Sequence, residues 1–119
     1  MNNPVTPVRG EIWYVDWSPA RGSEQAGRRP SLIVQADAPN RNPRYPNTIV
    51  ATISEHGRDI PSHVRLEPTP ENGLAYASYV KCEQILTISK SRLQERIGGV
   101  EEADLRRVEQ ALKRMLALP

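Results

Sequence analysis

The feature that most constrains the fold is a change in hydrophobic period near residue 89. Before it, apolar residues come in short runs typical of β-strands, separated by prolines and glycines. After it, residues 101–116 show the spacing of an amphipathic helix, with apolar side chains at Leu105, Val108, Leu112, Met115 and Leu116. Short strands followed by one C-terminal helix predict a mainly β (α+β) fold. We expect a small antiparallel barrel or a strongly bent sheet with the helix packed on it.

The expected strands share short length, apolar or β-branched composition and boundaries rich in proline, glycine or asparagine. They span residues 9–17, 31–36, 47–54, 61–67 and 74–88, the last as one bent strand or two short ones. The run Thr48–Ile53 is strongly β-branched and predicts a central strand. Residues 9–17 carry large side chains on both faces, which indicates a strand covered on both sides.

Two connecting segments carry predictions of their own. Residues 37–47 contain three prolines and are expected to form a long mobile loop. Residues 89–96 are expected to make one or two helical turns, which Gly98 and Gly99 end. Since the chain has no phenylalanine and few other aromatics, its core must consist mainly of valine, isoleucine, leucine and alanine.

The length favours a single domain over residues 1–119, because a chain of this size buries roughly two thirds of its unfolded surface. No apolar run approaches the ~20 residues of a membrane span. Residues 1–7 lack the basic and apolar regions of a signal peptide. We therefore expect a cytoplasmic protein that does not contact membranes.

Cysteine chemistry and metal binding are both disfavoured. Cys82 is the only cysteine, and it lies in a strand-like run without the sharp glycine turn of a nucleophile, so a small buried residue is expected there. His56 and His63 are too few and too scattered for a zinc motif, and the chain has no paired acidic motif. We expect neither a metal nor a cofactor.

Positive charge is concentrated in the early part of the chain. The formal net charge is +2, but residues 21–44 alone hold five arginines against two carboxylates, an excess of three. Residues 66–119 are balanced. Because arginine makes bidentate contacts to phosphate and stacks on bases, this cluster favours a nucleic-acid partner. An arginine-rich codon composition is the alternative explanation.

The segment over 22–30 places a carboxylate, a hydroxyl, an amide and two arginines between two expected strands. This set suits metal-free RNA cleavage, in which the substrate's own 2′-OH attacks the adjacent phosphorus. An arginine stabilises the charged phosphorane but, with a pKa above about 12, is a poor proton acceptor. Glu24 suits that role better. In the alternative reading, Arg29 is a surface residue paired with Glu24 or Asp37.

Two blocks of residues cover nearly the whole chain from Arg9 to the C-terminal helix. The first contains Arg9-Gly10-Glu11-Ile12-Trp13, Asp16, Pro19, Gly22-Ser23-Glu24-Gln25-Ala26-Gly27 and Arg29-Pro30. The second contains Cys82-Glu83-Gln84-Ile85, Thr87-Ile88, Lys90, Arg92-Leu93 and Ile97-Gly98. In this order, the blocks resemble the MazF/PemK family of toxin endoribonucleases.

The resemblance implies an SH3-like β-barrel of the MazF/PemK/CcdB type and a homodimer. It further implies sequence-specific, metal-independent cleavage of single-stranded RNA, with 2′,3′-cyclic phosphate and 5′-OH products. The partner it implies is an acidic, MazE-like antitoxin peptide that covers the RNA groove.

The same resemblance implies site residues. It places Glu24, Arg29 and Ser54 at catalytic positions, with Ser54 where many members have threonine. Thr52 would face the same way as Ser54, so the two remain interchangeable at this point. The residues expected to bind RNA are Ser23, Gln25, Arg28, Thr52 and Gln84.

Other readings of the chain remain open. A toxin of the same barrel fold could instead poison a protein such as DNA gyrase, although the Glu-Gln-Ala-Gly-x-Arg-Pro pattern argues against it. An RNA-binding module without chemistry is a third possibility. Individual side chains have structural alternatives as well: Ser54 could cap a turn before Gly57, and Gln84 could be a structural hydrogen bonder. Trp13 and Trp17 could stack on bases or belong to the core or a dimer interface.

Overall fold

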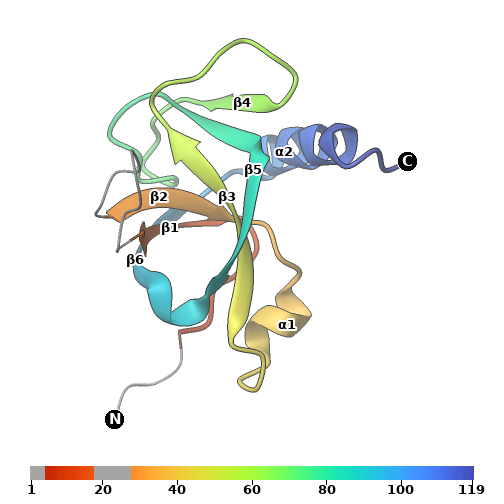
Figure 1. Cartoon of the computed structure of the whole chain (residues 1–119). Coiled ribbons are helices and arrows are strands. Elements are labelled where there is room, and N and C mark those ends of the chain that lie inside the picture. Colours follow the sequence, from red (N-terminus) through yellow and green to blue (C-terminus); the bar gives the residue numbers. More distant parts are fainter. Residues whose placement is uncertain (1–4, 18–27) are drawn as a thin grey trace.

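The structure is a computed structural model that describes residues 5–17 and 28–119. Its strands are β1 (Glu11–Asp16), β2 (Arg28–Ile33), β3 (Asn47–Ser54), β4 (His63–Leu66), β5 (Ser78–Ser89) and β6 (Leu93–Gly99). Its helices are α1 (Asp37–Arg41), the 3-10 helix η1 (Lys90–Arg92) and α2 (Glu102–Met115). The strands form one antiparallel sheet in the order β4-β5-β3-β2-β1-β6 (Figure 1).

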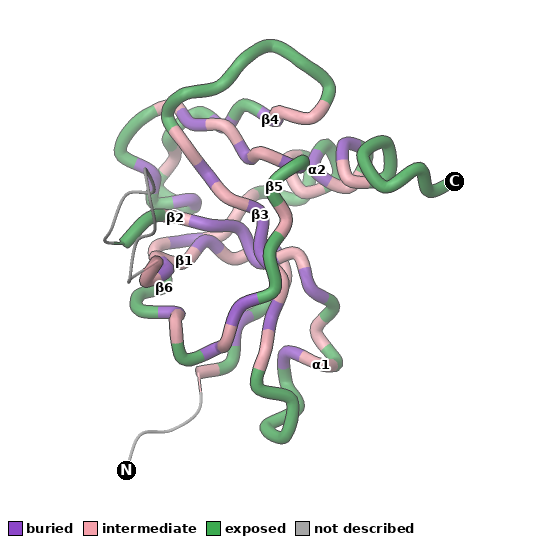
Figure 2. The backbone as a smooth tube through the Cα atoms, viewed as in Figure 1, coloured by how far each residue is buried: buried purple, intermediate pink, exposed green. Residues whose placement is uncertain are grey.

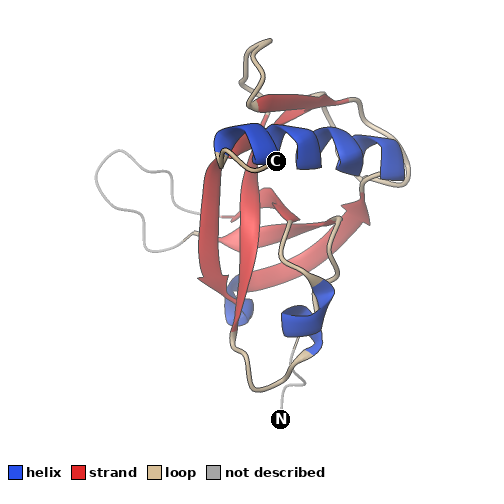
Figure 3. Ribbon diagram, turned by 90° about the vertical axis from the view of Figure 1, so that its right-hand side faces the viewer, coloured by secondary structure: helices blue, strands red, loops and turns tan. Residues whose placement is uncertain are grey.

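The predicted mainly β fold with a C-terminal helix is confirmed, and β3 occupies the expected central position between β5 and β2. The sheet is strongly curved (Figure 3). Its edge strands, β4 and β6, lie at opposite ends of the strand order, so the sheet is open and not a closed barrel.

Both connecting segments differ from the sequence prediction. Residues 37–41 form the helix α1, because the buried Asn40 ties it to the sheet: its Oδ1 accepts from Gln35 Nε2 at 2.9 Å and from Thr48 Oγ1 at 2.8 Å. Helical turns were predicted for residues 89–96, but only the three residues of η1 are helical. The strand β6 follows and pairs with β1, and this pairing includes Gly98 and Gly99. Buried side-chain hydrogen bonds in the first segment and pairing with a distant strand in the second therefore override the local glycine and proline signals.

The central strands are buried on both faces (Figure 2). One face packs against α2 through a cluster that contains Ile12, Leu32, Ile53, Val80 and Val108. The opposite face is filled by Val15, Ile33, Val50, Ile88 and Leu93, against which Trp13 and Trp17 pack. The expectation that residues 9–17 are covered on both sides is confirmed, and the core is aliphatic as expected.

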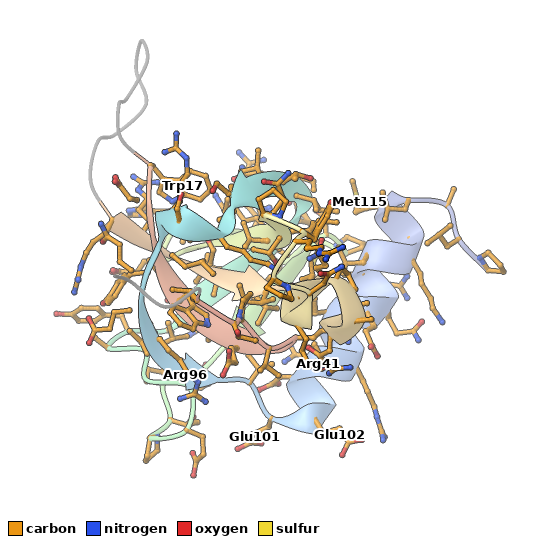
Figure 4. The ribbon with its side chains drawn as sticks, turned by 90° about the horizontal axis from the view of Figure 1, so that it is seen from below. Trp17, Arg41, Arg96, Glu101, Glu102 and Met115 are labelled. Atoms are coloured by element: carbon orange, nitrogen blue, oxygen red, sulfur yellow. The ribbon has the colours of Figure 1, made fainter. Side chains whose placement is uncertain are left out.

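The helix α2 lies across the sheet and packs on β4 and β5 (Figure 3). It buries Val108 and Ala111, and its two ends carry acidic and basic residues in the sense that suits the helix dipole. Glu101 and Glu102 lie at its start and Met115 at its end (Figure 4). None of the helices in the described residues has the length and apolar character to cross a membrane.

The segment between β4 and β5, residues 67–77, is fixed by Asn72, whose exposure is only 3%. Its Oδ1 accepts from the backbone N–H groups of Thr69 and Leu74, both at 3.0 Å, and its Nδ2 donates to the carbonyl of Glu67 at 2.8 Å. Gly73 follows with a φ of +69°. A Cβ there would lie 1.9 Å from the carbonyl oxygen of Ile97, so the segment packs directly on β6.

A candidate active-site groove

Arg29 and Ser54 lie near each other at one end of the β2–β3 pair. β2 and β3 pair with Ser31 opposite Thr52 and Leu32 opposite Ala51. The pairing ends at Ser31 and Thr52. Arg29 lies two residues before this end on β2, and Ser54 lies two residues after it on β3. Arg29 and Ser54, which are far apart in the sequence, therefore both lie at this end of the strand pair, and they line the same pockets.

Two pockets adjoin at this point and share Arg29, Pro30, Ile53 and Ser54. The first, of about 420 Å³, is also lined by Tyr14, Arg28, His56 and Tyr76, and we call it the Tyr76 pocket. The second, of about 430 Å³, is also lined by Trp17, Thr52, Lys81, Gln84 and Leu86, and we call it the Gln84 pocket. Arg29 and Ser54 thus stand between two hollows, each of a size that small ligands occupy.

The hydroxyl of Ser54 is oriented by the backbone. Its Oγ accepts a hydrogen bond from the N–H of His56 at 3.1 Å, which is the turn-capping contact that the sequence allowed. A hydroxyl can accept and donate at once, so this contact leaves the Ser54 proton free to be donated into the groove.

Thr52 has a different environment. Its Oγ1 donates to Gln84 Oε1 at 2.6 Å, so its proton already has an acceptor. This contact exists because β5 bulges: Ala51 pairs with Ile85, whereas the next residue, Thr52, pairs with Lys81. The three residues between them turn Gln84 toward Thr52, as bulges beside functional sites often do. Of the two hydroxyls left open by the sequence, Ser54 is the better donor to a bound anion.

Arg28 lies at the rim of the Tyr76 pocket. Its guanidinium pairs with Glu95 at 3.2 Å and lies 4.2 Å from the centre of the Tyr14 ring. Both members of the ion pair are more than half exposed, so the pair is weak and the arginine can exchange its carboxylate for another anion. The remaining candidates, Ser23, Glu24 and Gln25, lie outside the described residues.

Comparison with known proteins places the chain among toxins. A family model described as PemK-like, MazF-like toxin of type II toxin-antitoxin system matches residues 8–116. The chain belongs to this family. It is 38% identical to the endoribonuclease EndoA of Bacillus subtilis over 112 residues, which cover 92% of this chain and 94% of the relative. It is 40% identical to the endoribonuclease MazF9 of Mycobacterium tuberculosis over 114 residues, with 92% and 96% covered.

Solved structures agree with this assignment. The fold is similar to that of an endoribonuclease from Mycobacterial species, with a TM-score of 0.78, 27% identity and coverage of 97% of this chain and 95% of that one. A Mycobacterial endoribonuclease in complex with its cognate antitoxin also matches, with a TM-score of 0.78, 28% identity and coverage of 95% and 97%.

In this PemK/MazF-like chain, the structure adds groove residues that sequence reasoning missed. Lys81 lines the Gln84 pocket opposite Thr52, a position that depends on the β5 bulge. His56 and Tyr76 line the Tyr76 pocket from the connecting segments on either side of β4. No local pattern marks these three, because loop packing and strand register bring them to the groove. Trp17 lines the Gln84 pocket, Trp13 lines neither of the two pockets described above, and both pack against the core.

His63 and Glu83 form a separate pair that lines neither pocket. His63 Nδ1 accepts from the N–H of Arg58 at 3.0 Å, so in the neutral ring Nε2 carries the proton and donates to Glu83 Oε2 at 2.8 Å. Burial is the largest single influence on the pKa of Glu83 and would raise it. The hydrogen bonds from His63 and the backbone, together with the positive charges of His63 and Lys81, outweigh burial, and the pKa is lowered. The pair holds the β3–β4 connection on β5.

Across residues 5–17 and 28–119, no three His, Cys, Asp or Glu side chains are grouped to hold a metal ion.

Cys82 is a fully buried residue of β5 and is unsuited to catalysis. Burial, helped by the Glu83 carboxylate, raises the pKa of its thiol to about 11. An unfolded thiol has a pKa of about 8.5, so from there to pH 11 the unfolded chain loses a proton that the folded chain keeps, and stability falls as the pH rises. We predict that Cys82→Ala removes about 2 kcal/mol of the stability loss between pH 8 and pH 10. Urea unfolding of both proteins at several pH values measures it; parallel curves would contradict the buried, protonated thiol.

Proposed function

We propose that this chain is a sequence-specific, metal-independent endoribonuclease that cleaves single-stranded RNA as the toxin of a type II toxin–antitoxin system. One observation carries the proposal: Arg29 and Ser54 stand together on the wall shared by two pockets. That arrangement holds one phosphate between two neighbouring nucleotides. The names of the relatives, which are endoribonucleases at 38% and 40% identity, support the same activity.

In the proposed reaction, the 2′-OH of the RNA attacks the adjacent phosphorus, and the bond from phosphorus to the 5′-oxygen breaks. The 2′-OH loses its proton to a base and the leaving oxygen gains one, which yields a 2′,3′-cyclic phosphate and a 5′-OH. Arg29 neutralises the charge of the phosphorane with a bidentate contact, and Ser54 donates to a phosphate oxygen. Glu24, which lies outside the described residues, is the proposed proton acceptor.

Residues around these two complete the proposed RNA site. Lys81 and Arg28 supply positive charge on the two sides of the scissile phosphate, one in each pocket. Gln84 keeps its amide N–H groups for a base or phosphate, because its Oε1 is engaged by Thr52. Ser23 and Gln25 stay predictions as RNA contacts.

Primer extension on a long RNA incubated with the purified chain tests the activity. Discrete new 5′ ends are expected. RNA that is bound with a steep salt dependence but stays intact would indicate a binding module without chemistry. Intact RNA together with inhibition of DNA gyrase would indicate a toxin with a protein target.

Ser54 and Thr52 can be separated by mutation. We expect Ser54→Ala to lower kcat/KM by about tenfold to a hundredfold, because a donor to the transition state is lost. Ser54→Thr keeps the hydroxyl and should retain most activity. Thr52→Val removes only the contact to Gln84 and should cost about fivefold or less. Cleavage rates of one fluorogenic RNA measure all three variants, and a larger loss in Thr52→Val than in Ser54→Ala would assign the phosphate contact to Thr52.

Regulation and assembly follow the family. We infer that an acidic, MazE-like antitoxin peptide covers the basic groove and competes with RNA. We also infer that residues 1–119 form a single domain and that the protein acts in the cytoplasm. A structural neighbour was solved with its cognate antitoxin, which supports this partner. We also expect a homodimer, and sedimentation as a monomer at micromolar concentration would count against it.

A further inference from the structure

Tyr76 is held at the lip of the Tyr76 pocket with an exposure of 65%, the highest among the exposed large hydrophobic residues of the described chain. The backbone beneath it is fixed: its carbonyl accepts from Ser78 Oγ at 2.9 Å, and Asn72 and Gly73 pin the same segment to β6. A large aromatic ring on a rigid backbone and open to solvent indicates a contact surface for a ligand.

The rest of this pocket has a matching character. Tyr14 carries the Arg28 guanidinium 4.2 Å from its ring centre, which puts a second aromatic and a flat cation in the same lining. Pro30, Leu74 and Ile97 add apolar surface. In single-stranded RNA sites, unpaired nucleobases stack on the flat faces of aromatic rings and guanidinium groups beside apolar side chains. Arg29 and Ser54 also line this pocket, so a base bound in it would belong to a nucleotide whose phosphate reaches both residues.

We propose that Tyr76 stacks on the unpaired base of a nucleotide next to the scissile phosphate. The proposal rests on the proposed RNA cleavage and adds a substrate-binding residue to it. Because every base has a π-face, the contact holds the strand in place without selecting its sequence. Removal of the ring should therefore raise KM and leave the pattern of cut sites unchanged.

A binding experiment tests the contact. The probe is a fluorescent single-stranded RNA that spans a mapped cut site and carries one 2′-deoxynucleotide at the cleaved position, which blocks internal attack. Anisotropy should show about tenfold weaker binding for Tyr76→Ala and near-normal binding for Tyr76→Phe. Tyr45→Ala is the matched control, since Tyr45 is also exposed (39%) but lines neither pocket. Urea unfolding checks that the variants keep wild-type stability.

A second probe removes the partner of the ring. Abasic sites are placed, one at a time, on either side of the cleaved phosphate. At one position the abasic site should weaken binding to wild type by about tenfold and have little further effect on Tyr76→Ala, because base and ring act as a pair. Equal losses in both proteins at both positions, or wild-type binding by Tyr76→Ala, would overturn the stacking contact.

The outcomes also separate this proposal from the function on which it rests. Discrete RNA cleavage with unaltered KM in Tyr76→Ala refutes only the stacking contact. If Tyr76→Ala keeps wild-type RNA affinity but changes the sedimentation coefficient, the ring contacts a second copy of the chain and the proposal is wrong. RNA that is neither cut nor bound by wild type refutes both.

Discussion

Arg29→Ala is expected to lower the rate of RNA cleavage by about a thousandfold. Arg29 lines both pockets beside Ser54, where the scissile phosphate is proposed to lie. A permanent cation that meets the charge of the transition state contributes more than a neutral donor does, and such arginines are worth about 10³-fold or more. Single-turnover cleavage of a fluorogenic RNA measures the chemical step directly.

The chain offers matched controls for this experiment. Arg41 lies on α1, away from Trp17 and the Gln84 pocket that Trp17 lines (Figure 4), and it lines neither pocket. Arg41→Ala removes the same charge and should keep wild-type cleavage. Arg28→Ala should lose only about tenfold, because Arg28 lies at the rim and shares its charge with Glu95. Equal losses of cleavage rate in all three variants would mean that only the net charge of the protein matters, which would contradict a specific role for Arg29.

Gly73→Ala is expected to have the largest effect on stability. Its φ of +69° disfavours any side chain, and the added Cβ would lie 1.9 Å from a backbone oxygen of Ile97. Left-handed backbone and forced overlap in a packed region together cost about 3 kcal/mol or more. Because residues 67–77 carry Tyr76 to the groove, cleavage should fall as well. Urea unfolding measures the stability.

Gly99→Ala is the control for that substitution. Gly99 lies in β6, two residues after the Ile97 that Gly73 packs against. The nearest atom that an added Cβ at Gly99 would meet outside its chain neighbours is 3.6 Å away. Such contacts are ordinary, so the free energy of unfolding should change by less than about 1 kcal/mol. A large loss in Gly99→Ala, or a small one in Gly73→Ala, would mean that the two glycines are not distinguished by backbone packing.

The sequence predicted what is encoded by local periodicity. The β-branched run gave the bounds of β3 correctly, and helical spacing predicted α2 to within one residue at each end. β6 was missed because its glycines and charges carry no strand signal, and only pairing with β1 makes it a strand. α1 was missed because the buried contacts of Asn40 stabilise it, which sequence spacing does not reveal.

The candidate site divides in the same way. Arg29, Ser54 and Gln84 were named through the family resemblance, but only the pairing of β2 with β3 and the bulge of β5 explain why all three line one pocket. The choice between Ser54 and Thr52 needed the hydrogen bond of each hydroxyl. Lys81 and Tyr76 reach the groove through that bulge and through the packing of residues 67–77 on β6, so no local pattern marked them.

The Arg29–Ser54 groove is proposed to cleave RNA through the substrate's own 2′-OH. This proposal is tested most directly with two oligonucleotides that span one mapped cut site, one entirely RNA and one with a single 2′-deoxynucleotide at the cleaved position. Both are incubated with the purified chain in excess EDTA, and the product ends are identified by mass spectrometry. We predict that the RNA is cut to a 2′,3′-cyclic phosphate and a 5′-OH and that the substituted strand stays intact. Cleavage of the substituted strand, or 3′-OH ends from the RNA, would contradict the claim.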